Sequence, residues 1–341
     1  KNATAFTNRY IEEGLRDRAL TRDLAWGIPV PKDGYDEKTI YIWAENVLGY
    51  LSASKTAADR RGEDFAALWG TDAKHYYVHG KDNIPFHTVI LPALLLGNTA
   101  AGGFHWHLPD QIVSSEYLTL EGNKISTSKN YAIWVKDILD RYEPDSLRYF
   151  FLANGPEKKD ADFSWREYVN SHNGELLGAY GNFINRSLSF IHKYWNGTVP
   201  TGTPDRELTR QISELFTTTG ALIEKAAFKD ALNGIFDFIR SANKYFDTEQ
   251  PWITRDTDEA ACQNTLYNCV QIIANLAVLL APFLPFTSEK VCNWLNLTTD
   301  WNLKSVPAGY QLPEIEILFQ RIDKKVIEDE TEKLTGLQVT Q

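Results

Sequence analysis

The chain changes its pattern of hydrophobic and polar positions near residue 135. Before this point, short β-rich runs alternate with helical stretches, and residues 86–96 are predicted to form a helix packed on a sheet. The predicted strands are residues 39–43, 74–79, 111–113 and 117–120. This alternation of element types predicts an open α/β sheet.

After residue 135, nearly every segment has helical periodicity. The predicted helices are residues 135–141, 145–153, 165–195, 205–226, 229–246, 260–280 and 287–295. Residues 153–162 form a polar loop, and Ser164 with Glu167 has the spacing of a capping box, which marks a helix start. The sequence therefore predicts an α/β part followed by a helix bundle.

The helix predicted around residues 175–195 has two distinct faces. Its apolar face consists of Leu177, Tyr180, Ile184, Leu188, Ile191 and Trp195, and its polar stripe of Asn182, Arg186, Ser189 and Lys193. A polar stripe is most simply a solvated face. Asn and Arg one turn apart can also read splayed RNA bases when an aromatic ring lies nearby. Trp252 is a candidate ring, because Pro251 is expected to end the preceding helix and leave the indole in a loop.

Chain length, net charge and hydrophobic stretches limit the classes of protein to which this sequence can belong. A chain of 341 residues exceeds what one hydrophobic core usually organises, so two domains are expected. The formal charge of −10 argues against nonspecific coating of nucleic acid, although it leaves room for one basic face. The longest apolar stretch, residues 272–286, is interrupted by two prolines and an asparagine, so no membrane span is predicted. The first residues do not resemble a secretion signal, and we expect a cytoplasmic protein.

The three cysteines, Cys262, Cys269 and Cys292, lie within apolar helical patterns. They have neither disulfide spacing nor metal-ligand spacing. Buried free thiols are therefore the expected state, and we predict no metal site in this chain.

A loop with phosphate-binding chemistry follows the last predicted strand of the α/β part. It reads Glu-Gly-Asn-Lys-Ile-Ser-Thr-Ser-Lys over residues 121–129 and supplies Lys124, Ser126, Ser128 and Lys129. Flexible lysines neutralise negative charge on a leaving pyrophosphate, while hydroxyls and backbone N–H groups hold phosphate oxygens. Taken alone, the same residues fit a solvated connecting loop equally well.

Polar and aromatic residues follow other predicted strands. Asp82 comes just after the second one, at the edge where parallel sheets bind a ribose; a helix cap or turn carboxylate is the alternative. Trp43, Tyr50 and Phe86 are large rings that suit an apolar pocket for a thioether. These rings fit an ordinary core as well, and a lone histidine such as His87 is more often structural.

Together these motifs resemble the methionyl-tRNA synthetases, which are class I aminoacyl-tRNA synthetases. The loop is similar to the second class I signature, Lys-Met-Ser-Lys-Ser, with Thr127 where the family has its second lysine. Other landmarks follow in the family's order: Trp26-Gly27-Ile28-Pro29-Val30-Pro31, Tyr41-Ile42-Trp43, Gly49-Tyr50, Gly80-Lys81-Asp82 and Phe86-His87-Thr88. The resemblance extends to residues 318–325 and so covers nearly the entire chain.

The resemblance implies a role for each of these residues. The catalytic residues would be Lys124, Lys129 and Arg22, with Lys129 taking over part of the missing lysine's role. ATP would be bound by Gly80, Asp82, Lys124, Ser126, Thr127 and Ser128. Methionine would be bound by Trp43, Asn46, Val47, Tyr50, Phe86 and His87, where Asn46 and Val47 replace the Ala-Pro often found in the family. The CAU anticodon would be recognised by Asn182, Arg186 and Trp252.

The implied fold is α/β plus all-α. Residues 1–134 would form the second half of a Rossmann-type catalytic domain, 135–170 a stem-contact connector, 171–310 a helical anticodon-binding domain, and 311–341 a segment packing back toward the core. The first class I signature, His-Ile-Gly-His, and the family's Cys-rich zinc knuckle are absent. We therefore expect that the N-terminal half of the core is missing and that this chain alone is inactive.

The implied reaction is ATP-dependent activation of L-methionine to methionyl-adenylate, followed by transfer to the 3′ end of tRNA(Met). ATP would act as its Mg²⁺ complex, and zinc would belong only to the missing N-terminal half. The expected partners are tRNA(Met), L-methionine, ATP and that N-terminal half, with no membrane partner. Two alternatives remain: a class I synthetase for cysteine, leucine or valine, and a noncatalytic tRNA-binding module with a scaffold core.

Overall fold

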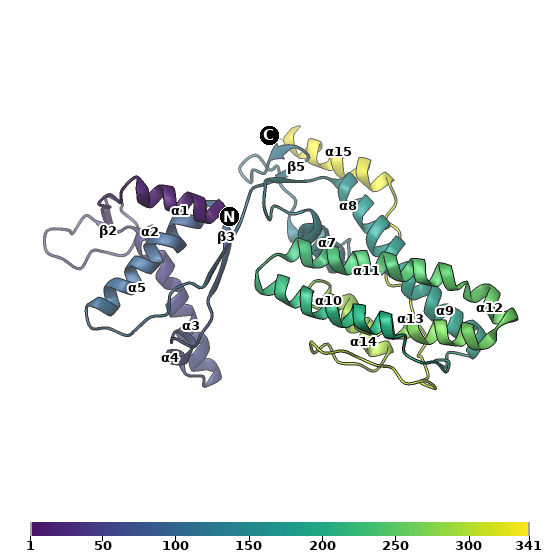
Figure 1. Ribbon diagram of the computed structural model, residues 1–341. Coiled ribbons are helices and arrows are strands. Elements are labelled where there is room, and N and C mark those ends of the chain that lie inside the picture. The colour runs from purple at the N-terminus through teal and green to yellow at the C-terminus, as the bar shows by residue number, and fades with distance from the viewer. Residues whose placement is uncertain (1, 340–341) are drawn as a thin grey trace. The chain divides into compact units, whose positions relative to one another are not determined.

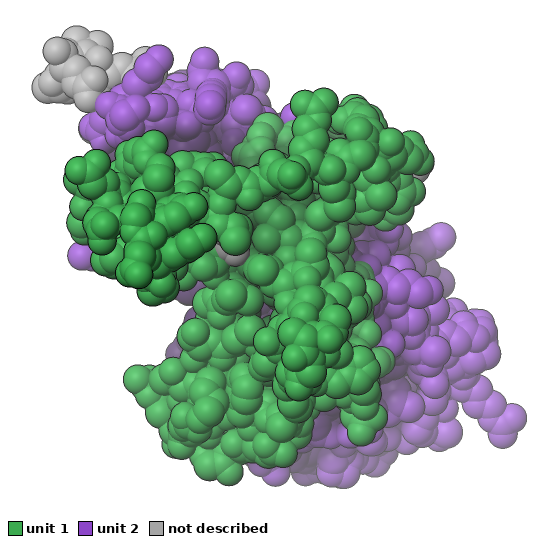
Figure 2. Space-filling model, turned by 90° about the vertical axis from the view of Figure 1, so that its left-hand side faces the viewer, with its two compact units in different colours: residues 1–117, 157–159 green, residues 118–156, 160–341 purple. Residues whose placement is uncertain are grey.

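The structure, a computed structural model, describes residues 2–339 of the chain (Figure 1). Two units are compact in themselves and are drawn in two colours in Figure 2. Unit 1 contains the residues up to Tyr117 together with residues 157–159, and unit 2 contains residues 118–156 and the residues from Asp160 onward. The loop with phosphate-binding chemistry therefore groups with the helices that follow it.

Unit 1 combines two small sheets with short helices. β1 (Thr21–Arg22) pairs antiparallel with β2 (Thr39–Ile40), and β3 (Tyr76–Gly80) pairs parallel with β4 (Gln111–Ser115). The helices are α1 (Asn2–Glu12), α2 (Ile42–Glu45), α3 (Gly49–Arg61), α4 (Phe65–Leu68) and α5 (Leu91–Ala100), with shorter turns η1 (Asn46–Leu48), η2 (Lys81–Asn83) and η3 (Phe86–Ile90). Because η3 runs directly into α5, the predicted helix over residues 86–96 is confirmed and extends to Ala100.

Two expectations for this part of the chain were wrong. The strand predicted over residues 39–43 ends at Ile40, because Tyr41 is the N-cap position of α2, which begins at Ile42. The predicted strands also do not form one open sheet within residues 2–339, since they belong to separate sheets of two or three strands. β3 and β4 still show the parallel pairing expected of an α/β fold.

One face of the parallel pair β3–β4 is open. Tyr77 is 8% exposed and belongs to a core cluster with Trp69 and Leu91. Val78, the next residue, is on the other face and is 66% exposed. Parallel sheets are normally covered on both faces, and in this structure the outer face of the pair lacks such a cover.

Unit 2 begins with a three-stranded sheet and continues as helices. β5 (Leu118–Leu120) lies between β6 (Asn123–Lys124), which is antiparallel to it, and β7 (Ala161–Phe163), which is parallel to it. The helices are α6 (Val135–Leu139), α7 (Pro144–Asn154), α8 (Trp165–Ser171), η4 (His172–Gly181), α9 (Asn182–Trp195), α10 (Arg206–Glu224), α11 (Phe228–Glu249), α12 (Pro251–Thr257), α13 (Glu259–Leu280), α14 (Pro285–Trp294) and α15 (Lys325–Val339). Every helix predicted after residue 135 is confirmed. The helix start predicted at Ser164 is confirmed too, because the hydroxyl of Ser164 accepts the N–H of Glu167 at 3.2 Å.

The main core of unit 2 lies between α9, α10, α11 and α13, of which α10 and α11 run alongside each other (Figure 1). Tyr180, Ile184, Leu188 and Ile191 are at most 1% exposed, which confirms the central positions of the predicted apolar face. The three cysteines are buried free thiols, as expected. Within residues 2–339, none of the helices combines the length and the hydropathy that a membrane span requires.

Two side chains of α7 form hydrogen bonds at the turn between α13 and α14. Asp145 accepts the N–H of Thr287, in the first turn of α14, at 2.7 Å. Arg148 donates to the carbonyls of Phe283 and Pro282, just past the end of α13, at 2.8 and 3.1 Å. A carboxylate at a helix N-terminus and a guanidinium beyond a helix C-terminus both complement the helix dipole. Since α7 also belongs to the core cluster around β5, it joins the bundle to the sheet of unit 2.

Candidate functional site

The loop with phosphate-binding chemistry starts from a tight turn at the end of β5. Glu121 and Gly122 have positive φ angles of 46° and 74°, a conformation that glycine adopts without steric cost. Asp162 of β7 holds the turn, because its Oδ1 accepts the N–H of Gly122 at 2.9 Å and the hydroxyl of Thr119 at 2.5 Å. The base of the loop is thus fixed to the sheet of unit 2.

Beyond this turn the loop closes on itself and leaves its polar side chains outside. The backbone N–H and carbonyl groups of Ser126 and Tyr131 pair with each other, both at 2.9 Å, and the hydroxyls of Ser126 and Ser128 lie 3.2 Å apart. Lys124 and Lys129 are exposed and form no ion pair in the part of the chain that the structure describes. Two unpaired ammonium groups beside two hydroxyls make a surface suited to polyphosphate.

Asp82 lies where the sequence predicted it, just beyond the C-terminal end of β3. The strand ends at Gly80, which is paired with Ser115 of β4. The hydroxyl of Tyr117 donates to Asp82 Oδ1 at 2.5 Å, so the exposed carboxylate is held by a neighbour from beyond β4. The carboxyl ends of parallel strands are where α/β sheets bind nucleotides, and a carboxylate there is suited to accepting hydrogen bonds from ribose hydroxyls.

The predicted pocket residues that carry rings form two pairs. The ring centroids of Trp43 and Phe86 lie 5.3 Å apart, and the hydroxyl of Tyr50 lies 2.8 Å from Nε2 of His87. Because Nδ1 of His87 lies 2.9 Å from the carbonyl of Asn83, the neutral ring carries its proton on Nδ1, and Nε2 accepts from Tyr50. Burial lowers the pKa of His87 by disfavouring its charged form. The pair therefore presents a neutral, hydrogen-bonded imidazole.

A cavity of about 280 Å³ in unit 1 includes one of these pairs. Trp43 and Phe86 line it together with Tyr41, whereas Tyr50 and His87 are not part of its lining. The structure therefore brings the predicted pocket rings together in pairs, and of the two pairs only Trp43 with Phe86 lines this cavity.

The remaining predicted residues of unit 1 are placed differently. Val47 is 5% exposed and belongs to the core cluster of Tyr77, so it is a packing residue. Asn46 is exposed, and its side chain makes no hydrogen bond to a described residue. The guanidinium of Arg22 lies 3.6 Å over the ring of Tyr41, which lines the cavity. Arg22 is thus held next to the cavity by a stacked ring.

The predicted base-reading residues come together on the bundle. Arg186 of α9 lies 4.1 Å over the ring of Phe246 and pairs with Asp247 at 2.6 Å. The ring of Phe246 lies in turn 6.1 Å from that of Trp252. Asn182, one helical turn before Arg186, donates a hydrogen bond to the same helix, α11. An amide, a guanidinium and an indole share one surface, which is the combination that reads unstacked bases.

Trp252 lies in a helix, and its predicted position in a loop was wrong. Gln250 has a φ of 45°, which ends α11, and Pro251 is then the first residue of α12. Proline is favoured at the first helical position, because its φ already fits and its missing N–H has no partner to lose there. The indole is 43% exposed and so remains open to a binding partner.

Comparison with known families agrees with these sites. A family model described as tRNA synthetases class I (M) matches residues 1–188, more than half of the 341 residues. The chain belongs to this family. A second model, described as the anticodon-binding domain of tRNA ligase, matches residues 205–332, which include Trp252. The family and the α/β plus helical architecture predicted from the motifs are thereby confirmed.

Curated relatives in this class I family match nearly the whole chain. Methionine--tRNA ligase of Bacillus cereus (strain Q1) is 53% identical over 337 residues, which are 98% of this chain and 61% of the relative. Methionine--tRNA ligase 1 of Alkaliphilus oremlandii (strain OhILAs) is 52% identical over 334 residues, with the same shares. The chain thus spans about 61% of the length of the curated relatives it matches.

Solved structures of the class I family are also similar. The apo form of Mycobacterium tuberculosis methionyl-tRNA synthetase has a TM-score of 0.80, and its complex with methionyl-adenylate has a TM-score of 0.82. Both are 26% identical in sequence, and each match covers 94% of this chain and 64% of the other. The likeness therefore extends over both the α/β and the helical parts.

Several residues that complete these sites were not found from the sequence. Tyr117 holds Asp82, Asp162 holds the turn of the loop, and Phe246 with Asp247 positions Arg186. Each of these contacts joins distant parts of the chain, such as Arg186 and Asp247, which are 61 positions apart. No short-range spacing marks such a partner, so only the fold reveals it.

Proposed function

We propose that this chain forms part of an enzyme that attaches methionine to tRNA(Met). The enzyme activates L-methionine with ATP to methionyl-adenylate and then transfers the methionyl group to the 3′ end of the tRNA. The observation that carries the proposal is the presence, in one chain, of a class I core of the methionine family and the surface of Asn182, Arg186 and Trp252. The Bacillus and Alkaliphilus relatives are named for this activity.

In the activation step, a carboxylate oxygen of methionine attacks the α-phosphate of ATP, and the bond to pyrophosphate breaks. Negative charge then grows on the leaving pyrophosphate, where Lys124 and Lys129 neutralise it. Ser126, Thr127 and Ser128, with the backbone N–H groups around them, hold the phosphate oxygens. The exposed, unpaired state of both lysines supports this role.

The residues of unit 1 bind the adenosine and methionine groups. Gly80 and Asp82 bind the adenosine part, with the carboxylate accepting from the ribose hydroxyls. The methionine site consists of Trp43, Asn46, Val47, Tyr50, Phe86 and His87, with Val47 acting through core packing. A thioether contacts aromatic rings favourably, so the pairing of Trp43 with Phe86 supports this site. Arg22, stacked on Tyr41, is the proposed supporting cation.

ATP enters the proposed reaction as its Mg²⁺ complex. Zinc is proposed only for a part of the enzyme outside this chain. Aminoacylation of tRNA supplies protein synthesis, so we infer that the enzyme works in the cytoplasm.

The N-terminal half of the core is proposed to cover the open face of β3–β4. Val78 is 66% exposed on that face, and parallel sheets are normally covered on both sides. The chain also spans only about 61% of its relatives' length. Residues 1–134 then complete a Rossmann-type domain with that half, residues 135–170 form the connector, and residues 311–341 pack back toward the core. On this proposal the chain by itself is inactive.

The test is ATP–pyrophosphate exchange by this chain combined with the remaining segment of the Bacillus relative. Methionine is expected to support exchange at a rate roughly 100-fold above that with cysteine, leucine or valine. Exchange driven by another amino acid would identify a different class I synthetase. A complex that binds tRNA(Met) but exchanges with no amino acid would instead support a noncatalytic tRNA-binding module.

A further inference from the structure

We infer that Tyr194, Arg255 and Lys193 form a second RNA-stacking platform, which takes a base flanking the anticodon triplet. The guanidinium carbon of Arg255 lies 4.2 Å over the ring of Tyr194, and the ammonium of Lys193 lies 5.0 Å from the same ring. A cation, an aromatic ring and a planar guanidinium are the groups that bind single-stranded RNA. The inference rests on the proposed function, since RNA must reach this surface of the bundle.

The platform continues the two helices that carry the proposed anticodon-reading residues. Tyr194 follows Arg186 by eight residues on α9, which corresponds to about 12 Å along the helix axis. Arg255 follows Trp252 by three residues on α12, so these two side chains are neighbours one turn apart. The platform is thus two turns beyond Arg186 on α9 and adjoins Trp252 on α12. A base on the platform therefore lies next to the triplet and not within it.

The platform is open on its outer side and supported on its inner side. Tyr194 is 37% exposed, and the ring of Phe190, which packs against the main core, lies 4.6 Å from it. Two hydrogen bonds to Asp256, at 2.8 and 2.7 Å, fix the orientation of the Arg255 guanidinium. A guanidinium bound through its edge keeps its faces for stacking, so a base can continue the stack that begins with Tyr194.

Lys193 gives the platform a charge for the RNA backbone. It is exposed and has no ion-pair partner among the residues that the structure describes. The charge of Arg255, by contrast, is balanced by Asp256. Lys193 is therefore suited to a phosphate, and Arg255 to the flat face of a base. A pair that only joins α12 to α9 would not need a further ammonium group beside the same ring.

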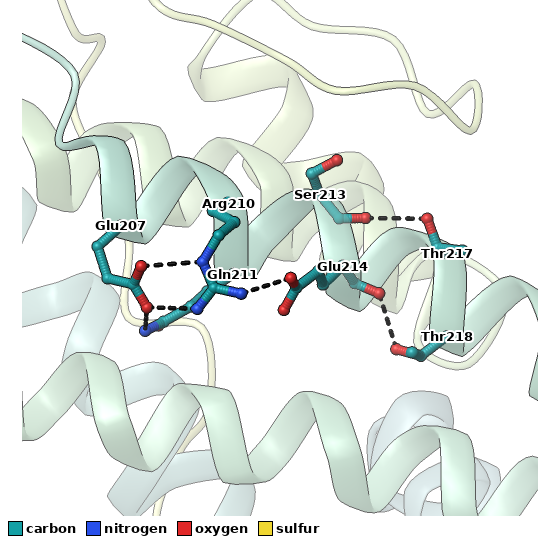
Figure 3. Close-up of polar contacts among 7 residues, drawn as sticks. All are labelled: Glu207, Arg210, Gln211, Ser213, Glu214, Thr217 and Thr218. Atoms are coloured by element: carbon teal, nitrogen blue, oxygen red, sulfur yellow. Dashed lines mark hydrogen bonds and ion pairs between the residues drawn. The ribbon is translucent and has the colours of Figure 1, made fainter.

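The test measures binding of a hairpin RNA with the anticodon stem and loop of tRNA(Met) to the whole enzyme. Arg255→Lys keeps the charge and removes the planar group, and Tyr194→Leu removes the ring. Each is expected to raise Kd about tenfold. Arg210→Lys is the matched control, because Arg210 is also a surface guanidinium on the bundle but is held only by Glu207 and Glu214 (Figure 3). Its Kd is expected to stay unchanged.

A hairpin RNA from which one base of the anticodon loop has been removed shows which nucleotide the platform binds. A hairpin that lacks the base flanking the triplet is expected to bind the unmodified enzyme about tenfold more weakly and to lose nothing further with Arg255→Lys. Wild-type affinity of both variants, while Trp252→Ala weakens binding, would overturn the platform and leave the proposed function intact. If Arg255→Lys binds with wild-type affinity and Tyr194→Leu does not, Arg255 contributes only its charge, and the proposed stacking of a base on its guanidinium is overturned. If Trp252→Ala also binds the hairpin with wild-type affinity, like the two platform variants, the result contradicts the proposed function itself.

Discussion

Thr127 is the residue at which the phosphate-binding loop departs from the class I signature. Its carbonyl accepts the N–H of Asn130 at 3.0 Å, so the turn fixes its backbone. Its side chain is exposed and makes no hydrogen bond to a described residue. A lysine at this position would therefore need no rearrangement, and we propose that Lys129 supplies the second cation of the loop.

Lys124→Ala is expected to slow methionine-dependent pyrophosphate exchange about 100-fold, because one charge-stabilising group is lost from the transition state. Lys129→Ala is expected to slow it as well, and Thr127→Lys is expected to restore the activity of that variant. The measurement is the exchange rate at saturating ATP, with Lys136→Ala as a control outside the loop. A Lys129→Ala enzyme with full activity would show that Lys129 does not replace the missing lysine.

Two buried histidines make the stability depend on pH. His87 and His172 both have their pKa lowered by burial. In His172, Nε2 faces the carbonyl of Gln320 and Nδ1 faces the hydroxyl of Ser146, both at 2.8 Å, so the neutral ring satisfies both contacts. The unfolded chain takes up a proton at a higher pH than the folded one. The stabilisation is therefore present above the unfolded pKa and is lost as pH falls through the folded pKa.

The free energy of unfolding is expected to fall as the pH drops below about 6.5, by up to about 1.4 kcal/mol per pH unit for each histidine. Denaturant titration across this range measures it. His172→Gln keeps a polar side chain that cannot titrate, so its slope is expected to be smaller than that of the unmodified chain. Identical slopes for the two proteins would contradict the assignment of a buried neutral ring.

At the scale of elements, side chains of α7 bind the ends of two other helices of unit 2. Its Asp145 caps the start of α14, and its Arg148 binds the carbonyls after α13. Asp145 is 2% exposed, and its burial raises its pKa while the hydrogen bonds from Thr287 oppose that rise. Removing the carboxylate would leave a buried N–H without a partner.

Asp145→Ala is expected to lower the free energy of unfolding of the helical part by about 1–3 kcal/mol. Asp145→Asn keeps an acceptor oxygen and is expected to lower it by less. Thermal or denaturant unfolding followed by circular dichroism measures both. The control is Glu207→Gln, which breaks an exposed ion pair on α10 (Figure 3) and is expected to have no measurable effect. Equal stability of Asp145→Ala and the unmodified chain would show that the cap is dispensable.

The sequence predicted the elements that have a strong local pattern. The long helices of the bundle were predicted because their apolar residues recur at three- and four-residue spacing over many turns. β7 was missed because it has three residues and is defined by its pairing with the distant β5. Helix α12 was missed because Pro251 was interpreted as a stop, whereas it begins a helix. The contacts that position Arg186 and Asp82 come from residues far away in sequence, so no local pattern predicts them.

At the scale of the whole molecule, the proposed chemistry is divided between the two units. Unit 1 contains the proposed methionine pocket and Asp82, and unit 2 contains the loop with phosphate-binding chemistry and the bundle proposed to bind RNA. The open face of β3–β4 belongs to unit 1. The N-terminal half proposed above is therefore expected to affect the chemistry of unit 1 and to leave RNA binding by unit 2 unchanged.

This division predicts that the chain alone binds an anticodon hairpin of tRNA(Met) and supports no pyrophosphate exchange. Addition of the N-terminal segment is expected to start exchange and to change the Kd for the hairpin less than about threefold, because the bundle contacts do not depend on that segment. Fluorescence anisotropy and an exchange assay measure the two properties. Exchange by the chain alone would contradict the proposed role of the N-terminal half.

The most direct test of the central claim is the kcat/KM for methionylation of tRNA(Met) with its CAU anticodon against the same tRNA with an altered anticodon. The complemented enzyme is expected to prefer CAU strongly. Arg186→Ala and Trp252→Ala are each expected to lower kcat/KM for the CAU tRNA about 10- to 100-fold and to remove most of the preference. If both variants discriminate against the altered anticodon as well as the unmodified enzyme does, the anticodon-reading surface lies elsewhere.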